Sequence, residues 1–243
     1  MRRFVQAFVP DALPSGLPAE VADALGSAPD RYNIAKRKPA AVIFDRGDGL
    51  RVEDFDWGLV PRWSKLPETR YTTVTARLER APSSRIFKRP WESTRCVVPM
   101  TGYYKWDRGA KPARPYFIQP ESGEVLFAAG LWDHWDKDEP ELYSFAILTH
   151  RNPAIPPPLV PDGPLFMPAA KVAEWIRGPS APAGFLLRMS QPALEAYPVS
   201  RRIRSPDVDD YTLLEPAAAV DPEEAGTPED GLLDDDIWDD EDE

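Results

Sequence analysis

Short apolar runs that recur along the chain predict β-strands. They are rich in β-branched and aromatic residues, each is bounded by Gly, Pro, Asp or Ser, and they occupy 40–44, 95–100, 115–119, 125–132 and 143–150. Between the third and fourth runs, Ser122-Gly123-Glu124 predicts a hairpin turn. Strands are therefore expected to dominate the fold.

Helical patterns are fewer and shorter than the strand patterns. They occupy 18–26, 82–90, 168–177 and 190–196, and no internal repeat is visible. The 29 prolines favour short strands and irregular loops over long helices. We therefore expect a single α+β domain with a mainly antiparallel, barrel-like sheet and short helices at its periphery.

Composition narrows the class of protein. Among 243 residues, 42% are hydrophobic, which is enough to bury a core, and no apolar run approaches the ~18 residues that span a bilayer. The single cysteine, Cys96, excludes an internal disulfide framework, and with only two histidines the chain is poorly equipped to bind zinc. We expect a soluble cytoplasmic protein, able to associate with the nucleoid, that holds neither metal nor cofactor.

The net charge of −11 is unevenly distributed. From Ala217 onward there are 13 acidic residues and no Lys or Arg, which leaves 27 acidic against 29 basic residues in the rest of the chain. The chain thus divides into a nearly neutral body, residues 1–216, and a polyanionic tail, residues 217–243. Because the tail lacks the aliphatic content to pack, we expect it to be disordered.

The tail has three possible roles. It could simply keep the protein soluble, it could occupy the body's own DNA-binding groove, or it could recruit a protein partner. The third interpretation depends on four apolar residues within the acidic sequence, namely Leu232, Leu233, Ile237 and Trp238. They favour a docking role, with either a partner or the body itself.

Eight segments of the body together carry a family resemblance. They are "RYNIA" 31–35, "DWGLVPRW" 56–63, "TARLERAPSSRIFKRPW" 75–91, "RCVVPMTGYYKW" 95–106, "PYFI" 115–118, "FAAGLW" 127–132, "FAILT" 145–149 and "YPVSRRI" 197–203. In their order and spacing they resemble the SOS response-associated peptidase (SRAP) family, which senses abasic sites in single-stranded DNA. The resemblance extends from the N-terminus to about residue 216.

The resemblance implies a specific chemistry that this chain cannot perform. Members of the family lose their initiator Met and use an N-terminal Cys to form a thiazolidine with the ring-opened sugar. Here "MRRF" stands in place of the family's Met-Cys-Gly-Arg-Phe, so the thiol is missing. Arg2 is too bulky for efficient removal of Met1, so we expect Met1 to stay and autoproteolysis to be absent. The Met1 α-amine could still form an imine.

The other site positions implied by the family are partly retained. Arg77 and Thr149 are kept. The replaced positions are Thr75 for the family's Asn, Lys105 for its Glu, Val160 for its His and Asp162 for its Arg. The surrounding frame is kept, so the sequence indicates a SRAP fold that can bind DNA but has lost the family's cross-linking chemistry.

Lys105, in the sequence "TGYYKW", has three interpretations. It could contact a DNA phosphate, it could be a drifted residue that extends into solvent, or it could be a nucleophile. In the last case an amine near Arg77 would have a lowered pKa and could form a Schiff base with an abasic aldehyde. Phosphate contact is the interpretation that we favour from sequence.

A DNA-binding surface is expected around these positions. Its expected phosphate contacts, stacking residues and pocket residues are Arg2, Arg3, Arg77, Arg85, Trp63, Trp106, Thr75 and Thr149. For Lys88 and Arg89 an ordinary solvated face is equally plausible. Trp57, Trp91 and Cys96 are expected in the core, and His150 on the strand face opposite Thr149.

Three functions from different classes follow. The first is a protein that binds single-stranded, junction or abasic DNA without a covalent step, and this is the function that we favour from sequence. The second is an enzyme that acts on abasic DNA through an imine at Lys105 or at the Met1 amine. The third is an interaction protein that acts through its acidic tail. The sequence does not indicate an oligomeric state.

Overall fold

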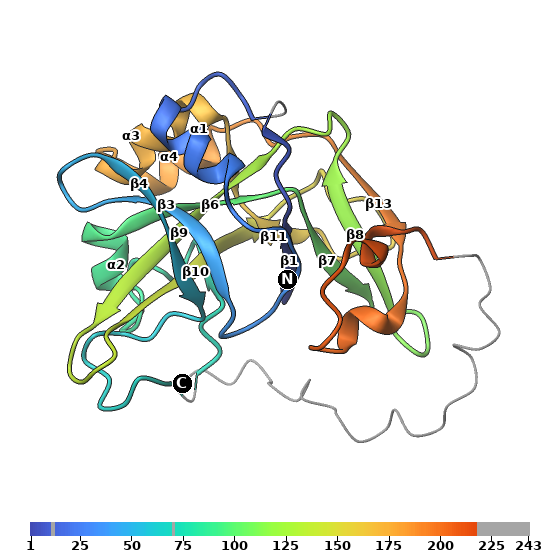
Figure 1. Ribbon diagram of the computed structural model, residues 1–243, viewed down its shortest axis with the longest axis horizontal. Helices are drawn as coiled ribbons and strands as arrows, with labels where there is room; N and C mark the ends of the chain where they lie inside the picture. Colours follow the sequence, from blue (N-terminus) through green and yellow to red (C-terminus); the bar gives the residue numbers. More distant parts are fainter. Residues whose placement is uncertain (11–12, 70, 218–243) are drawn as a thin grey trace.

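The strands form two sheets in the computed structural model, which describes residues 1–10, 13–69 and 71–217 (Figure 1). The four apolar residues of the acidic tail, and the tail beyond residue 217, lie outside the described residues, so their predicted roles stay predictions. Within the described residues, every helix is too short or too polar to cross a membrane.

The first sheet, sheet A, is antiparallel throughout. Its strands, in spatial order, are β13 (Leu194–Pro198), β8 (Arg114–Pro120), β7 (Gly102–Asp107), β1 (Arg3–Gln6) and β2 (Arg31–Ile34). The chain's N-terminal strand is therefore held between two others, β7 and β2. This arrangement fixes Met1 and Arg2 beside the middle of the sheet rather than at its edge.

The second sheet, sheet B, closes on itself. Its strands, in spatial order, are β11 (Asp162–Pro164), β10 (Leu142–Arg151), β4 (Leu50–Trp57), β3 (Pro39–Asp45), β6 (Arg95–Met100), β9 (Leu126–Trp135) and β12 (Phe166–Met167), and β5 (Thr75–Arg77) also pairs with β10. Because β10 pairs with both β4 and β9, the strands β10, β4, β3, β6 and β9 form a closed ring. Only the pairings of β10 with β4 and β5 are parallel. The predicted mainly antiparallel barrel is confirmed.

The helices are short and lie at the periphery, as predicted (Figure 1). They are α1 (Ala19–Gly26), α2 (Lys88–Ser93), α3 (Val172–Arg177) and α4 (Pro182–Leu187), with 3-10 turns η2 (Ala169–Lys171), η3 (Arg201–Arg204) and η4 (Tyr211–Leu214). In the figure α1, α3 and α4 lie together over one side of the barrel.

Three sequence predictions about local structure are wrong. Ser122-Gly123-Glu124 does not close a hairpin, because β8 before it belongs to sheet A and β9 after it belongs to sheet B. The segment predicted as a helix at 190–196 is not helical: its last three residues begin strand β13, which pairs with β8. Helix α4 was missed because it is a single short segment that begins with Pro182. The helix predicted at 82–90 begins only at Lys88.

Alternate residues of the barrel strands belong to two different parts of the core. On β10, Ala146 and Leu148 pack in a cluster with residues of α1, α3 and α4, whereas Phe145 and Ile147 pack in a cluster with residues of sheet A. The second cluster also holds Trp57, which is fully buried and donates a hydrogen bond from Nε1 to the Val74 carbonyl at 2.8 Å. The core placement expected for Trp57 is confirmed.

Gly102 is the position in sheet A with the least room for a side chain. A Cβ at this position would lie 2.3 Å from Phe117 Cζ and 2.6 Å from the Ile118 carbonyl oxygen. Gly102→Ala should therefore lower the free energy of unfolding by about 1–3 kcal/mol, measured by urea denaturation. Gly109→Ala, in the loop after β7 and near only Asp107, is the matched control. Equal stability of the two variants would contradict this packing.

Candidate functional site

Four residues meet where sheet A faces the edge of sheet B. Met1 precedes β1, Lys105 lies on β7, Arg77 ends β5 and Asp162 begins β11. We call these four residues the amine cluster, because it contains the chain's α-amine and the Lys105 ε-amine. Electrostatic coupling connects the α-amine to both Lys105 and Asp162.

Strand pairing positions Arg77 against Asp162. Thr149 of β10 pairs with Arg77 on one side and with Pro164 on the other, and Arg151 pairs with Asp162. Residues at these alternate positions share one face of the sheet. As a result, Arg77 Nη1 forms an ion pair with Asp162 Oδ1 at 2.7 Å. Two positions that are 85 residues apart in sequence are thereby held together.

A glycine after Asp162 allows β11 to approach β7 closely. A Cβ at Gly163 would lie 2.6 Å from Ile155 Cδ1 and 3.3 Å from the Tyr103 hydroxyl. Tyr103 and Lys105 are alternate residues of β7 and so share the face of the strand that meets β11. Lys105 Nζ consequently donates a hydrogen bond to the Asp162 carbonyl at 2.5 Å.

Lys105 and Asp162, which are in contact, both differ from the residues that the family resemblance implies at their positions. The family resemblance places an acid at position 105 and an Arg at position 162, and this chain has Lys105 and Asp162 instead. The two positions touch, and the Asp162 charge acts on Lys105 by favouring its protonated form. Lys105 thus contacts the backbone of Asp162, and the Asp162 carboxylate, which pairs with Arg77, also attracts the Lys105 charge.

The two amines of the cluster are less basic than usual. Burial lowers the pKa of the Met1 α-amine from 8.0 to about 5, and the positive charge of Lys105 is the second cause. Burial also lowers the pKa of Lys105, an effect that Asp162 opposes and that Arg108 and Arg77 reinforce. At neutral pH the α-amine therefore has a free lone pair and can act as a nucleophile.

The position that the resemblance assigns to a histidine is occupied by an exposed valine. Val160 has 63% of its surface exposed. His150 does not replace the missing histidine, because it lies on the face of β10 opposite Thr149 and interacts with Glu79 through Nδ1. The Tyr103 hydroxyl is buried beside Gly163 and has no hydrogen-bond partner among the described residues.

Arg3, which the sequence predicts as a DNA contact, forms hydrogen bonds within the protein. Its guanidinium donates from Nη1 to Asn33 Oδ1 at 2.6 Å and from Nη2 to the Arg204 carbonyl at 3.0 Å. Asn33 is itself buried and donates to the carbonyls of Ser205 and Val208. Arg3 thus connects the N-terminal strand to the C-terminal 3-10 turns.

Trp63 and Arg85 lie together on the surface. Arg85 Cζ lies 4.5 Å from the centre of the Trp63 ring, and Trp63 is 42% exposed. Such a pair combines a cation with a flat apolar face, as single-strand binding requires. Trp106 lies elsewhere, because it alternates with Lys105 on β7 and packs against the cluster that contains Tyr104 and Val199.

The other predicted positions divide between structure and surface. Trp91 and Cys96 are buried, and burial raises the pKa of the Cys96 thiol well above its usual value, so this thiol stays protonated.

Arg89 forms an ion pair with the buried Asp133 at 2.9 Å. Arg2 and Lys88 are exposed, and Thr75 is half-buried next to the core strand position Ile147. Among the described residues, no group of three or more His, Cys, Asp and Glu side chains could hold a metal ion.

The barrel, the second sheet and the cluster at their junction define a class of protein. The family model of the SOS response associated peptidase (SRAP) matches residues 2–206, so the chain belongs to the SRAP family. The resemblance inferred from the eight sequence segments is thereby confirmed.

Relatives in this family bear names that refer to abasic sites. The chain is 40% identical over 124 residues to the abasic site processing protein YMR114C of Saccharomyces cerevisiae. The aligned residues make up 50% of this chain and 33% of that protein. It is 28% identical over 190 residues to the abasic site processing protein YoqW of Bacillus subtilis. Here the aligned residues make up 76% of this chain and 85% of that protein. The chain thus spans a third of the yeast relative and most of the bacterial one.

Solved structures have the same fold. A protein from Bacteroides thetaiotaomicron superposes with a TM-score of 0.71 over 88% of this chain and 100% of that chain, at 24% identity. A phage-related protein from Bordetella bronchiseptica superposes with a TM-score of 0.63 over 83% of this chain and 95% of that chain, at 26% identity.

Proposed function

We propose that this protein binds DNA at abasic sites and that the Met1 α-amine forms an imine with the ring-opened sugar. The observation that carries the proposal is the position of the α-amine, which is buried beside Lys105 and Asp162 and has a pKa of about 5. The names of the relatives, which refer to abasic sites, support the choice of substrate.

The proposed reaction needs no thiol. The lone pair of the neutral α-amine attacks C1′ of the aldehyde, the aldehyde oxygen takes a proton, and the nitrogen loses one to give a carbinolamine. The Asp162 carboxylate is the carboxylate of the cluster, its charge acts on the α-amine, and it serves as the proton acceptor. Loss of water then gives the imine. Because no sulfur is available to close a ring, the adduct remains reversible.

Lys105 and Arg77 interact with Asp162 and supply positive charge to the site, and neither serves as the nucleophile. Lys105 Nζ is engaged by the Asp162 carbonyl, and Arg77 by the Asp162 carboxylate. Both cations lower the pKa of groups around them and favour a phosphate at the mouth of the cluster. The exposed pair of Trp63 and Arg85 supplies a surface for an unpaired base.

Borohydride trapping tests the proposal. The protein is incubated with a single-stranded oligonucleotide that carries one abasic site, and the reductant converts any imine into a stable secondary amine. We expect a covalent product on a denaturing gel, and none with an oligonucleotide that carries a tetrahydrofuran analogue, which has no aldehyde. Tight, salt-sensitive binding to abasic DNA without any trapped product would favour a binder without a covalent step.

The rate of trapping should depend on pH in a way that identifies a desolvated amine. A lowered pKa means that the neutral, nucleophilic form prevails above about pH 5 and is lost as the pH falls through that value. We expect half-maximal trapping by cyanoborohydride near pH 5. An ordinary α-amine would give a midpoint near pH 8, and that result would contradict the burial of the amine.

A further inference from the structure

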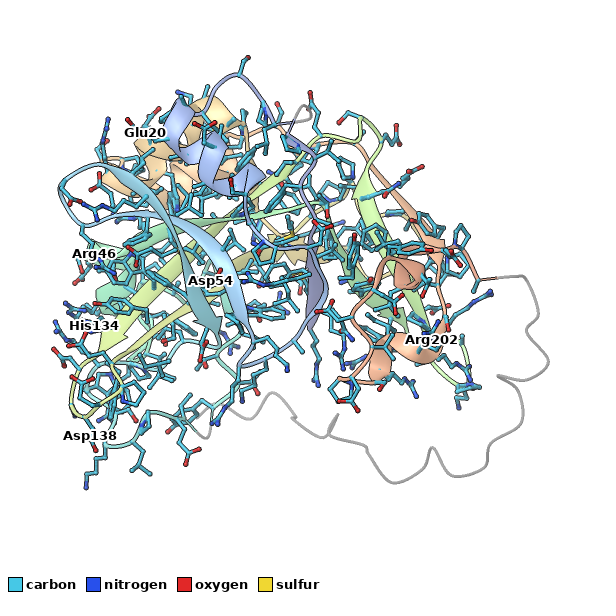
Figure 2. The ribbon with its side chains drawn as sticks, viewed as in Figure 1. Glu20, Arg46, Asp54, His134, Asp138 and Arg202 are labelled. Atoms are coloured by element: carbon cyan, nitrogen blue, oxygen red, sulfur yellow. The ribbon has the colours of Figure 1, made fainter. Side chains whose placement is uncertain are left out.

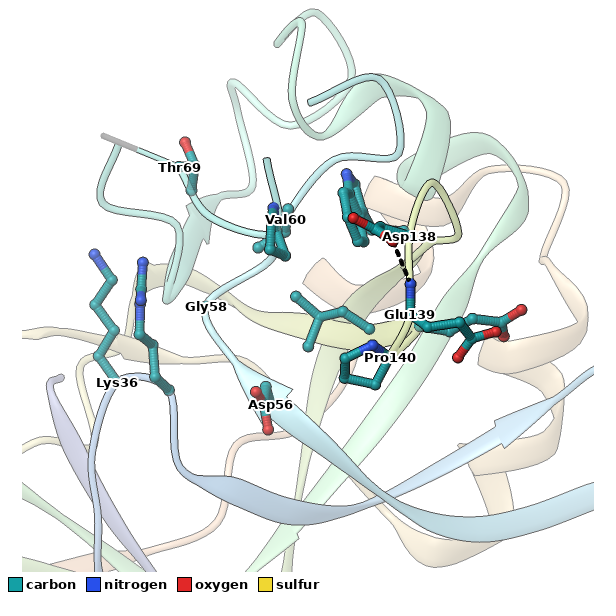
Figure 3. Close-up of a pocket in the computed structure, with 13 residues that line it drawn as sticks. Lys36, Asp56, Gly58, Val60, Thr69, Asp138, Glu139 and Pro140 are labelled. Carbon is teal, nitrogen blue, oxygen red and sulfur yellow. Dashed lines mark hydrogen bonds between the residues drawn. The ribbon is translucent and has the colours of Figure 1, made fainter. Parts of the chain in front are cut away.

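A cavity of about 240 Å³ opens between the end of β4 and the connection from β9 to β10 (Figure 3). Four segments form its walls: the turn after β2, the end of β4 with the residues that follow, the loop at 67–69, and the connection between β9 and β10. Val60, Leu142, Pro140 and Trp135 supply apolar surface. An apolar lining with a few polar groups is typical of a site for a small flat molecule.

Charges of opposite sign face each other across this cavity. Lys36 stands on one side, and Asp138 and Glu139 lie on the other, with Asp56 at the base (Figure 3). Arg37 and Glu141 also line the cavity. The cavity lies at the end of the barrel where Figure 2 shows Asp138, on the other side of the molecule from Arg202. Such a site suits a ligand with a negative charge at one end and hydrogen-bond donors at the other.

Most of the charged groups already have partners within the protein. Glu141 interacts with His134 at 2.9 Å, Asp138 accepts a hydrogen bond from the Glu139 backbone N–H at 2.9 Å, and Arg37 forms an ion pair with Glu68 at 3.1 Å. Lys36 and Asp56 differ. Within the part of the chain that the structure describes, Lys36 has no ion pair and no hydrogen bond reaches the Asp56 carboxylate.

Asp56 is held partly out of water. The residue is half-buried, and burial raises the pKa of its carboxyl, although the charge of Arg37 opposes this effect. A half-buried carboxylate without a hydrogen-bond donor gains more than an exposed one from a ligand that supplies N–H groups. The Glu139 carboxylate also has no partner among the described residues, but Glu139 is exposed, so Asp56 is the acid of this cavity that gains most from a ligand.

Two parts of the backbone connect the walls of the cavity to the residues of the amine cluster. A Cβ on Gly58, at the base of the cavity, would lie 3.5 Å from Lys36 Cγ and 3.8 Å from Val74 Cγ1. Val74 leads directly into β5 and Arg77. On the other side, Phe4 pairs with Ile34, so the antiparallel ladder brings the turn that carries Lys36 towards Met1 and Arg2. A DNA strand bound at the cluster would thus pass the mouth of the cavity.

We propose that this cavity binds an unpaired nucleobase next to the abasic site, and that Asp56 selects bases with amino groups on their Watson–Crick edge. Guanine fits best, because its N1–H and N2–H₂ groups are adjacent and can both donate to one carboxylate. Thymine offers a single N–H donor between two carbonyl acceptors, which the carboxylate repels. The Lys36 ammonium then meets the phosphate that precedes or follows the base. This inference rests on the proposed binding of abasic DNA.

The test measures base preference beside an abasic analogue. Single-stranded oligonucleotides that carry a tetrahydrofuran residue, flanked on either side by G, C, A or T, are titrated with the full chain. The analogue has no aldehyde, so only non-covalent affinity is measured. We expect G at one of the two flanks to bind roughly tenfold more tightly than T, the discrimination that a two-bond contact to a base edge provides.

Asp56→Asn should remove this preference and leave the affinity for the T-flanked strand within about twofold. The matched control is Asp54→Asn, which changes an exposed carboxylate of the same strand that pairs with Arg31 outside the cavity. This control should keep the full preference. Equal affinities for all flanking bases, or a preference that survives in Asp56→Asn, would overturn the inference.

The same experiments distinguish a failure of the proposed function from a failure of the base site. If the tetrahydrofuran strands bind no more tightly than undamaged DNA and borohydride traps nothing, abasic recognition itself is wrong. If trapping succeeds but the flanking base has no effect, only the base site is wrong.

Discussion

Lys105→Glu should weaken the binding of abasic DNA by roughly 10- to 100-fold, and addition of Asp162→Arg should restore it. The single substitution removes the cation that donates to the Asp162 backbone carbonyl and places a carboxylate there, within the field of the Asp162 charge. Like charges in a half-buried contact cost on the order of 1.5–3 kcal/mol, which corresponds to this loss of affinity. Asp162→Arg alone should also weaken the site, because the introduced guanidinium would face two cations, Lys105 and Arg77.

The double substitution recreates the charges that the family resemblance implies at positions 105 and 162. Its affinity should return to within about threefold of that of the original chain, and the coupling between the two changes should exceed about 1 kcal/mol. A matched control is Lys111→Glu, which reverses an exposed charge in the loop after β7. Additive effects of the two changes, with no rescue, would show that Lys105 and Asp162 act independently.

Blocking the α-amine should have the largest effect on the covalent step. Acetylation of Met1, or an N-terminal extension by several residues, removes the neutral nucleophile or moves it away from Lys105 and Asp162. The amount of borohydride-trapped product should fall at least roughly 100-fold. Holding an amine next to the aldehyde raises the rate of such reactions by several orders of magnitude, and the blocked chain loses this gain.

Lys105→Met separates the two amines of the cluster. It keeps the length of the side chain and removes the ε-amine, so trapping should persist, with weaker DNA binding. Trapping that survives acetylation of Met1 but disappears in Lys105→Met would identify Lys105 as the nucleophile, the third interpretation that the sequence offered for this residue.

The fold could largely be predicted from sequence because strand signals in this chain are local. All five apolar runs are strands, and their alternating residues supply both parts of the core. The hairpin at Gly123 and the helix at 190–196 were wrong for a different reason. Turn residues and short apolar patterns do not say which sheet a strand joins, and the pairing of β13 with β8 overrides local preference.

The site could be predicted only in part. The residues that the family resemblance selects include Arg77, Lys105 and Thr149, and the structure brings Arg77 and Lys105 together around Asp162. The structure does not bring Trp106 to the cluster, since strand alternation turns it to the opposite face of β7. Asp162 was selected in the sequence only as the residue at the position of an Arg that the resemblance implies, with no signal that it would pair with Arg77.

Two further features had no sequence signal. The burial that lowers the pKa of the α-amine depends on how β1 is held between β7 and β2, which are distant in sequence. The cavity combines four separate segments, and Asp56 stands out because its carboxylate is half-buried and no described group donates a hydrogen bond to it. Both features are properties of packing rather than of any motif.

Peptide mapping of the borohydride-reduced adduct tests the central claim most directly. The protein is trapped on an abasic oligonucleotide, digested, and analysed by mass spectrometry together with the intact mass of the untreated chain. We expect an unprocessed N-terminal Met1 and a sugar remnant on the N-terminal peptide, attached through the α-amine. An absence of any adduct, or an adduct only at a surface lysine, would contradict it.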